Sequence, residues 1–418
     1  MANHVHKMRE LCEITSSKRI FAADYKPEGV PFYRGKEISE KYRGNLDVST
    51  ELFIDRDKFE KIRAKFGSPV AGDLLLTSVG TLGSPYVVDD GEEFYFKDGN
   101  LTWFRNFKNL DSRFLYYWLL SPQGKAELKK CTIGSSQSAY TIVLLKDMEI
   151  HLRDLPTQRK IAAILSTYDD LIENNLRRIK ILEKMAQNLY REWFVNYRFP
   201  GHQQARFTDS PLGPIPEGWN VKRLDQVVAF QNNGSEAGEH LSDRVYLPID
   251  CIPRKSLAIS EIGAWQDAQS SLHLFDVGDI LFGAMRPYFH KVVVAPFKGV
   301  TRKTCFVFKG TLPEYHAFAT LTLFQESTVS YANAHSKGST IPYAVWPQSM
   351  DGMPVVVPAS EQAKKFEDAV GPMIARIGTM FFQNTTLRRT RDLLLPKLIS
   401  GEVDVSELDI AVPEEVAA

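Results

Sequence analysis

The residues whose spacing best suits catalysis are Glu127 and Lys129, which form the Glu-x-Lys pattern of some nuclease sites. Such a site also needs a matched acidic residue on a preceding strand, and no clear strand supplies one. The solvated face of a helix explains the pair better. The sequence also lacks a phosphate-binding loop, the GxSxG and HExxH motifs, and a glycine-rich turn that opens a helix. It has no Asn or Asp before a Pro-Pro-aromatic tetrapeptide. We therefore predict no catalytic residues.

Residue types that bind metals are present but scattered. The histidines include no pair four residues apart on a helix. The cysteines, Cys12, Cys131, Cys251 and Cys305, lie far apart and form no Cys-x-x-Cys pair. We expect no metal site, and unpaired, scattered thiols are typical of a cytoplasmic protein.

Composition and charge limit the class of protein. The 418 residues suffice for two or three domains, and 44% of them are hydrophobic, as in an ordinary globular protein. The formal net charge is zero. This argues against a uniformly basic surface but allows a local basic groove, because charges can be segregated by face. No apolar run reaches about 18 residues, and the first ten residues lack the apolar segment of a signal peptide, so we expect no membrane span.

One long stretch, residues 156–194, has the hydrophobic spacing of a helix that packs against a partner helix. Its seam residues recur at alternating steps of three and four over about four heptads. They are Leu165, Tyr168, Ile172, Asn175, Ile179, Leu182, Ala186, Leu189 and Trp193. Pro156 suits the first turn, and Thr157 can help to cap it. The helix should be about 55–60 Å long, which suits a spacer or a docking rod.

A second seam with the same spacing occupies the C-terminal part of the chain. Its residues are Phe366, Val370, Met373, Ile377, Met380, Asn384, Leu387, Arg391, Leu394 and Leu398. Each seam contains one Asn. Asn175 is either a tolerated polar position or a residue that fixes the register against a partner helix, which can lie in the same chain. We expect Pro396 to break the last turn and Gly401 to end the helix.

The chain repeats four landmarks in the same order, which indicates an internal duplication. The landmarks are Gly-Asp-Leu-Leu at 72–75 and Gly-Asp-Ile-Leu at 278–281, Gly-Ser at 134–135 and 338–339, Leu-Pro at 155–156 and Val-Pro at 357–358, and Leu-Arg-Arg at 176–178 and 387–389.

Each repeat has the pattern of a mixed α/β domain in which strands dominate. In the first repeat we predict strands at 30–33, 74–77, 86–88 and 93–96, a helix at 112–120, and an extended segment at 142–155. In the second we predict strands at 245–247, 279–282, 291–295, 303–308 and 353–357, and a helix at 315–324.

These patterns predict an α+β fold with two mixed α/β domains separated by two long helices. A cluster of Pro and Gly marks a linker at the start of the second domain. The predicted boundaries are 1–155 for the first domain, 156–199 for the central helix, 200–357 for the second domain with its linker at 200–219, 358–401 for the C-terminal helix and 402–418 for a tail.

The chain resembles the specificity (S) subunit of Type I restriction–modification systems over nearly its whole length. The likeness is strongest in the stretch that begins LPTQRKIAAIL, in the joint PLGPIPEGWNVKRL and in the end TTLRRTRDLLLPKLISGEVDV. The Gly-Asp-(Leu/Ile)-Leu elements and the Gly-Ser loops stand where the two target-recognition domains of that family carry them.

The resemblance implies a non-catalytic subunit whose two target-recognition domains each read one half of a bipartite site in double-stranded DNA. The two long helices would pack as an antiparallel coiled coil, separate the domains and dock two modification (methyltransferase) subunits. Motor–nuclease restriction subunits would join the same complex. S-adenosylmethionine would bind to the partner methyltransferase, so we expect no cofactor on this chain.

DNA contact requires cations for phosphates and forked donors for base edges. In the first domain the candidates are Lys18, Arg19, Arg34, Lys36, Arg105, Ser135, Ser136 and Gln137. In the second domain they are Arg244, Arg254, Lys255, Arg286, Tyr288, Lys291, Arg302, Lys303 and Lys337. We favour Arg34 and Arg286, because each follows a β stretch and lies near Gly or Pro. The alternative for every candidate is an ordinary solvated charge.

Two other functions compete with this interpretation. One is a stand-alone DNA-binding scaffold without active partners. The other is an enzyme with a nuclease or methylase activity of its own, which the missing motifs argue against.

Overall fold

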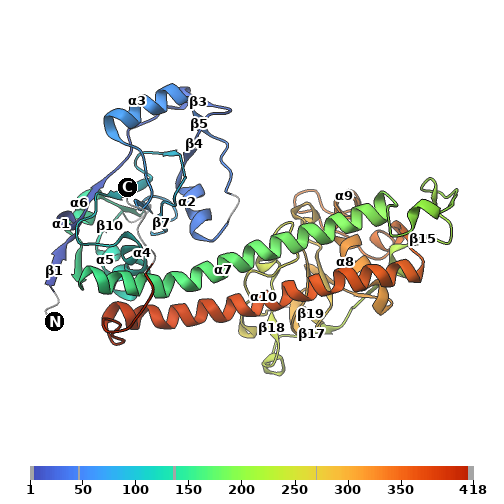
Figure 1. Cartoon of the computed structure of the whole chain (residues 1–418). Helices are drawn as coiled ribbons and strands as arrows, with labels where there is room; N and C mark the ends of the chain where they lie inside the picture. Colours follow the sequence, from blue (N-terminus) through green and yellow to red (C-terminus); the bar gives the residue numbers. More distant parts are fainter. Residues whose placement is uncertain (1–3, 46–47, 135–137, 270, 413–418) are drawn as a thin grey trace. The chain divides into compact units, whose positions relative to one another are not determined.

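A computed structural model of the chain describes residues 4–45, 48–134, 138–269 and 271–412 (Figure 1). The chain divides into two compact units. Unit 1 comprises Met1–Glu173 and Leu387–Ala418, and unit 2 comprises Asn174–Thr386. The long helices α7 (Leu155–Tyr190) and α10 (Ser360–Ser400) each contribute residues to both units. The fold is α+β, as the sequence predicts.

Unit 1 is built on a four-stranded antiparallel sheet with the order β2-β9-β6-β7. A second sheet, β3-β5-β4-β8, contains one parallel pair, β4 with β8. The strands are β1 (His4–Lys7), β2 (Glu13–Thr15), β3 (Tyr25–Lys26), β4 (Val30–Tyr33), β5 (Phe53–Ile54), β6 (Leu74–Thr77), β7 (Pro85–Val87), β8 (Tyr95–Phe96), β9 (Leu101–Arg105), β10 (Thr132–Ile133), β11 (Ala139–Tyr140) and β12 (Glu149–Leu152). The shorter helices are α1 (Met8–Leu11), α2 (Gly35–Tyr42), α3 (Arg56–Phe66), α4 (Ser112–Leu120), α5 (Pro122–Lys130) and α6 (Ile142–Asp147).

Unit 2 repeats the topology of the antiparallel sheet, whereas the strand order of its second sheet differs from that of unit 1. Its antiparallel sheet has the order β16-β23-β20-β21, and its second sheet, β17-β19-β22-β18, again contains one parallel pair. The strands are β13 (Phe207–Thr208), β14 (Ile215–Pro216), β15 (Asn220–Arg223), β16 (Val228–Phe230), β17 (Gly234–Ser235), β18 (Val245–Tyr246), β19 (Leu272–Phe275), β20 (Ile280–Gly283), β21 (Val292–Val294), β22 (Gly299–Arg302), β23 (Cys305–Gly310) and β24 (Pro354–Val357), and the shorter helices are α8 (His316–Phe324) and α9 (Glu326–Ala334). In unit 2 the pair β15–β24 corresponds to β1–β12 of unit 1.

The repeated Gly-Asp landmark is a tight turn that starts the central strand of each antiparallel sheet. Gly72 and Gly278 have φ of +83° and +87°, a backbone conformation that glycine adopts without the steric cost of a side chain. The next residue, Asp73 or Asp279, accepts a hydrogen bond from the backbone amide three residues earlier, over 3.0 and 2.8 Å. Burial raises the pKa of both carboxyls. The same local chemistry therefore starts β6 and β20.

In unit 1 the two long helices pack antiparallel. Leu165 of α7 lies in one core cluster with Leu395 and Leu398 of α10. Further along α7, Asp169 forms an ion pair with Arg391. Residue numbers rise along α7 as the numbers of their partners fall along α10, so the helices run in opposite directions.

The helices are antiparallel in unit 2 as well, and Figure 1 shows them side by side. Asn175 donates a hydrogen bond to Asn384 over 2.9 Å, and Ile179 packs with Ile377 and Met380. Of the other predicted seam residues, Ile172 is buried and Leu182, Leu189, Met373 and Leu387 are half-buried.

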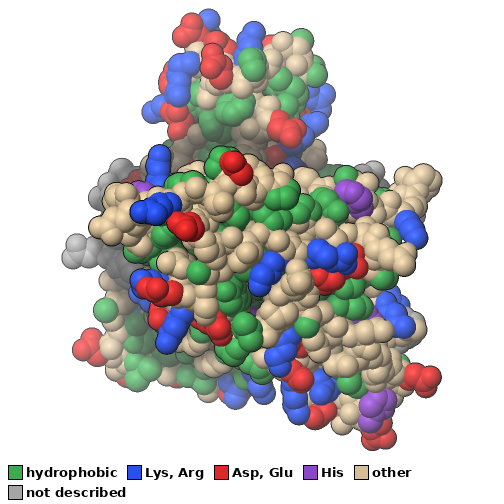
Figure 2. Space-filling view, turned by 90° about the vertical axis from the view of Figure 1, so that its right-hand side faces the viewer, with side chains coloured by type: hydrophobic (Ala, Val, Ile, Leu, Met, Phe, Trp, Pro, Cys, Tyr) green, Lys and Arg blue, Asp and Glu red, His purple; other side chains and the backbone are tan. Residues whose placement is uncertain are grey.

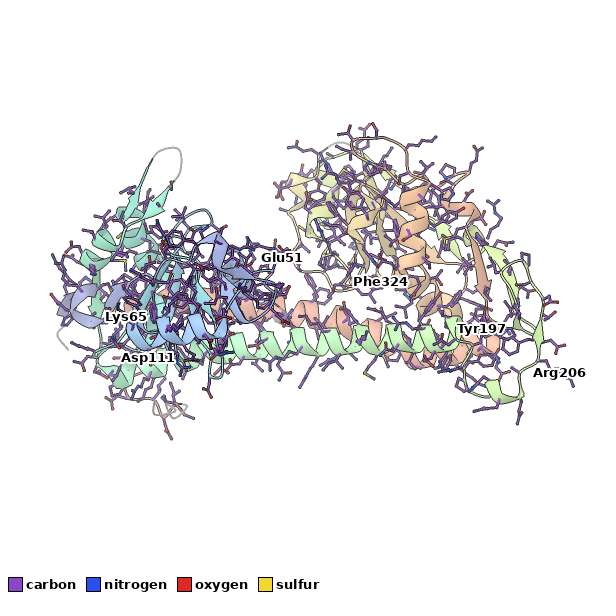
Figure 3. The ribbon with its side chains drawn as sticks, turned by 90° about the horizontal axis from the view of Figure 1, so that it is seen from above. Glu51, Lys65, Asp111, Tyr197, Arg206 and Phe324 are labelled. Atoms are coloured by element: carbon purple, nitrogen blue, oxygen red, sulfur yellow. The ribbon has the colours of Figure 1, made fainter. Side chains whose placement is uncertain are left out.

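Beyond α7, Trp193 and Phe194 lie in the main core of unit 2. Tyr197, which Figure 3 labels, packs against the same core.

The prediction of an extended segment over 142–155 was wrong for its first half, which forms α6. The hydroxyl of Thr141 caps this helix by accepting from the amide of Leu144 over 3.3 Å. Leu145 is fully buried in the core of unit 1. A cap and one apolar anchor thus favour a helical turn, and alternation is confined to β12.

The ends of the long helices also differ from the prediction. Pro396 does not break α10, which continues to Ser400 with buried leucines on either side of the proline. Packing therefore overrides the intrinsic cost of proline, and Gly401, at φ +80°, follows the last residue of α10.

Asp154 caps the start of α7, and its carboxylate accepts hydrogen bonds from the amide and the hydroxyl of Thr157 over 2.8 and 3.0 Å. No helix in the described ranges is both long and apolar enough to cross a membrane.

Candidate nucleic-acid interface

Four loops of unit 2 are joined by backbone hydrogen bonds, and we call them the unit 2 loop cluster. They comprise residues 252–259, 284–291, 302–304 and 337–343. The amide of Lys255 donates to the carbonyl of His290, and the amide of Arg286 donates to the carbonyl of Pro342, both over 2.8 Å. A third bond of 2.8 Å links Ala284 to the 302–304 turn. These bonds fix the loops relative to one another within unit 2.

An aromatic ring braces two arginines in this cluster. The guanidinium carbon of Arg254 lies 3.8 Å from the ring centroid of Phe289, and that of Arg286 lies 5.9 Å from it. A ring face attracts a guanidinium without consuming its hydrogen-bond donors. Tyr288, beside them, is 49% exposed. The cluster therefore holds forked donors in a restricted geometry, as contact with a phosphate or a guanine edge requires.

The backbone of the 286–290 turn is tightly constrained. Arg286 and His290 both have a left-handed conformation, with φ of +51° and +52°. His290 is buried, and its Nε2 lies 2.8 Å from the carbonyl oxygen of Phe324, which Figure 3 labels at the end of α8. A short 3-10 turn, Pro287–Phe289, connects the two residues. This anchoring limits the motion of Arg286.

Several cations of the cluster lack an acidic partner. Within the described residues no ion pair forms with Arg254, Arg286, Lys303 or Lys337, whereas Lys255 lies 3.5 Å from a carboxylate oxygen of Glu326. Uncompensated cations that lie close together make a local positive field, which attracts a polyanion.

Three other candidates in unit 2 have structural partners. Arg244 donates to two backbone carbonyls, at Phe275 over 3.1 Å and at Gly299 over 3.3 Å. The ammonium of Lys291 donates to the carbonyl of Ile249 over 2.6 Å, and burial lowers its pKa. Arg302 lies at the exposed end of β22 and donates to the carbonyl of residue 269 over 3.4 Å.

In unit 1, Arg34 is bound to a buried acid. Its guanidinium donates to Glu37 over 2.8 Å, and its backbone amide donates to the same carboxylate, also over 2.8 Å. Glu37 is 1% exposed. Burial acts to raise the pKa of Glu37, but the hydrogen bonds from Arg34 outweigh it and leave that pKa lowered. The pair caps α2, so Arg34 has a structural role beside any DNA contact.

The other candidates of unit 1 are also mostly paired. Arg105 stacks on Trp103 with 4.3 Å to the ring centroid and pairs with Glu13 over 2.7 Å. Arg19 pairs with Asp98 over 2.8 Å. Lys36 lies 4.0 Å from Glu40, and Lys18 lies 5.1 Å from the ring centroid of Phe66. Ser135, Ser136 and Gln137 lie outside the described residues.

Unit 1 has loops that correspond to the unit 2 loop cluster. The amide of Ser78 donates to the carbonyl of Asn100 over 2.8 Å, and the amide of Tyr140 donates to the carbonyl of Ser78 over 3.0 Å. Lys97 lies in the turn before β9, as Lys303 lies in the turn before β23. We did not predict Lys97 or Phe289 from the sequence. An alignment of the two repeats on their Gly-Asp landmarks points to Lys97, whereas the brace formed by Phe289 needs the fold.

The face of the molecule drawn in Figure 2 is mixed in charge. Figure 2 shows Lys and Arg side chains interspersed with acidic and hydrophobic ones on the face turned to the viewer. Within the described part of the chain, no group of three or more His, Cys, Asp or Glu side chains is placed to hold a metal ion. On this face the Lys and Arg side chains do not form one broad basic surface.

Comparison with known proteins gives a consistent result. Residues 3–184 match the model of the Type I restriction modification DNA specificity domain. The chain is 29% identical over 351 residues to the Type I restriction enzyme MjaIX specificity subunit of Methanocaldococcus jannaschii, covering 81% of this chain and 79% of that protein. The MjaVIII specificity subunit of the same organism is 28% identical over 215 residues, 49% of this chain and 48% of that one.

The fold has a solved counterpart. The crystal structure of the Type-I restriction-modification system S subunit from M. genitalium matches with a TM-score of 0.60 and 14% identity, covering 94% of this chain and 95% of that chain. At this identity the match concerns the fold. Taken with the sequence matches, it shows that the chain is similar to specificity subunits of Type I restriction–modification systems.

Proposed function

We propose that this chain selects the DNA sequence on which a Type I restriction–modification complex acts. Each unit reads one half of a bipartite site. The observation that carries this proposal is that the antiparallel sheets of the two units have the same strand order, while the loops of the two units differ in chemistry. Unpaired cations lie in the unit 2 loop cluster, whereas most candidate cations of unit 1 are paired. Two similar scaffolds with different loops suit a site whose halves differ in sequence.

The partners follow from this role. The chain binds double-stranded DNA and the other subunits of the complex, and we infer two modification subunits. S-adenosylmethionine binds to the methyltransferase partner, and the chain itself has a recognition role without chemistry of its own. A complex that acts on cellular DNA places the chain in the cytoplasm.

The long helices are the proposed docking surface for the modification subunits. Ile181 and Met185 are one turn apart on α7, and they are 58% and 46% exposed. Exposed apolar side chains on one face of a helix mark a surface that a protein partner can cover. The inward face of the same helix is already filled by Ile179 and its neighbours.

The proposal is tested by purifying the chain alone and then with a methyltransferase partner. Alone, the chain should neither methylate nor cleave DNA. With the partner and S-adenosylmethionine, adenine methylation should appear at one bipartite sequence. Methylation by the chain alone, or methylation scattered over unrelated sequences, would contradict the proposal. DNA binding without any association with the partner would instead support a stand-alone scaffold.

The interface within unit 2 is tested by Arg286→Ala. If the guanidinium of Arg286 binds a base edge, its removal should cost about 1–3 kcal/mol of binding free energy and relax one position of one half-site. Arg198→Ala is the control, because Arg198 is an exposed arginine that precedes the linker of unit 2. Unaltered affinity and unaltered site preference for Arg286→Ala would remove this residue from the interface.

A further inference from the structure

A buried glutamate on α7 accepts hydrogen bonds from one loop of the unit 2 loop cluster. Glu183 is 7% exposed. Its Oε1 accepts hydrogen bonds from the hydroxyl of Ser256 over 2.7 Å, the amide of Leu257 over 2.7 Å and the amide of Ala258 over 3.2 Å. All three donors belong to the 252–259 loop of the unit 2 loop cluster. One side chain of the long helix thus satisfies two loop amides, which would otherwise need water or another acceptor.

Apolar contacts hold the same segment against the helices. Leu257 is 2% exposed and belongs to the main core of unit 2. Ala258 packs against the cluster formed by Ile179, Ile377 and Met380. The second half of the loop is therefore part of the helix–loop interface, and its hydrogen bonds to Glu183 set its position along α7.

The same loop also carries two exposed cations. Arg254 and Lys255 immediately precede the anchored segment. Lys255 has φ of +54°, and its amide donates to the carbonyl of His290 over 2.8 Å. The guanidinium of Arg254 lies 3.8 Å from the ring centroid of Phe289. Only two residues separate Arg254 from Leu257, so displacement of the anchored segment moves the guanidinium off the ring.

We propose that Glu183 is a positioning residue for DNA recognition, because it anchors the segment that presents Arg254 to one half-site. This inference rests on the proposed function. In this proposal α7 does more than separate the units and bind partner subunits, because it also fixes the 252–259 loop of unit 2.

The hydrogen bonds of Glu183 can be tested separately from its negative charge. Burial raises the pKa of Glu183. All three hydrogen bonds end on one oxygen, and a glutamine side chain has an oxygen of the same reach. Glu183→Gln should therefore preserve the anchor, whereas Glu183→Ala removes it.

The anchor is measured by hydrogen exchange of the 252–259 segment in the full chain. Glu183→Ala should lose protection at Leu257 and Ala258, and Glu183→Gln should keep it. Glu192→Ala is the control, because it removes the same side chain from a more accessible site just beyond α7. Unchanged protection in Glu183→Ala would overturn the inference.

The role in recognition is measured by a double-mutant cycle. The probe is the duplex that the wild-type chain, in complex with methyltransferase subunits, enriches from a randomised library. Arg254→Ala should weaken binding to this duplex by about tenfold. Glu183→Ala should do the same, Glu183→Gln should stay within about twofold of wild type, and the Glu183/Arg254 double variant should bind no more weakly than Arg254→Ala.

Three results would overturn the role of Glu183. They are effects that multiply in the double variant, a Glu183→Gln variant as weak as Glu183→Ala, and normal binding by Arg254→Ala. A wild-type complex that enriches no sequence would refute the proposed function itself. Sequence enrichment without coupling between the two residues would refute only the role of Glu183.

Discussion

Asn175 of α7 and Asn384 of α10 form a hydrogen bond across the helix pair of unit 2, with 2.9 Å between Nδ2 of Asn175 and Oδ1 of Asn384. Asn384 is 3% exposed. The next contacts along the pair are apolar, between Ile179 and the residues Ile377 and Met380. A polar pair within an apolar seam is satisfied in one register, because a slip leaves both amides without a partner.

Replacing one member of this pair should destabilise unit 2. Asn175→Leu leaves the buried amide of Asn384 unsatisfied, so the free energy of unfolding should fall by about 1–3 kcal/mol. The double variant with leucine at both positions should be less destabilised than the single variant, because no polar group is then left buried. Urea unfolding of the full chain measures both effects.

Asn174→Leu provides the control for this prediction, because Asn174 is the exposed neighbour of Asn175 on the same helix. Asn174→Leu should change the free energy of unfolding by no more than about 0.5 kcal/mol. A double leucine variant as unstable as the sum of the two single variants would show that the pair does not act as a unit.

The helices are tied to unit 1 by a polar cluster. Tyr117 of α4 donates its hydroxyl proton to Asp169 over 2.6 Å, and the same carboxylate pairs with Arg391. Burial and the charge of Asp169 raise the pKa of Tyr117, so the hydroxyl remains a donor at neutral pH. Tyr117→Phe should lower the free energy of unfolding by about 1.5–3 kcal/mol. Tyr116→Phe should cost less, and equal losses would contradict a specific role for the Tyr117 bond.

The buried aspartate of the Gly-Asp turn should make stability depend on pH. Burial raises the pKa of Asp73 above its ordinary value of 3.8. The folded state therefore binds a proton more tightly than the unfolded state, and stability falls as pH rises from 3.8 through the raised pKa. Asp73→Asn retains an acceptor for the indole of Trp103 and does not titrate.

The prediction is that wild type loses stability relative to Asp73→Asn as the pH rises above about 4. The measurement is the difference in unfolding free energy between the two proteins at each pH, so that the titration of all other groups cancels. If this difference in unfolding free energy is constant with pH, or grows in favour of wild type as the pH rises, the pKa of Asp73 is not raised in the folded state.

The lengths of the long helices should set the gap between the two half-sites. Inserting one heptad into α7 after Glu173 and one into α10 after Thr386 keeps the helix pair in phase. Seven residues add about 10.5 Å of helix, which corresponds to about three base pairs. Mapping of methylated adenines should show a longer gap between unchanged half-sites. An unchanged gap would rule out the helices as the spacer.

Much of the fold follows from local sequence signals. The predicted bounds of α4, β4 and β6 agree with the structure. Asp111 caps α4, and Gly72-Asp73 starts β6, so adjacent residues decide where these elements begin. The short helix α6 was missed because its 6 residues are too few to show a helical period.

The interface was harder to predict, because its chemistry depends on pairing at long range. The sequence identifies Arg105 as a cation, but only the fold shows that Glu13, on another strand, neutralises it. Arg254 has no such partner in the described chain and instead meets an aromatic ring. The role of Glu183 also depends on the fold, because its three donors lie on a loop more than 70 residues away in the chain.

The central claim is that each unit reads its own half of one DNA site. It is tested most directly by replacing residues 220–357, from β15 to β24, with the corresponding module of a related specificity subunit and mapping methylated adenines produced with the methyltransferase partner. The account predicts that one half-site changes to that of the donor while the other half-site stays the same. A change in both half-sites, or in neither, would contradict it.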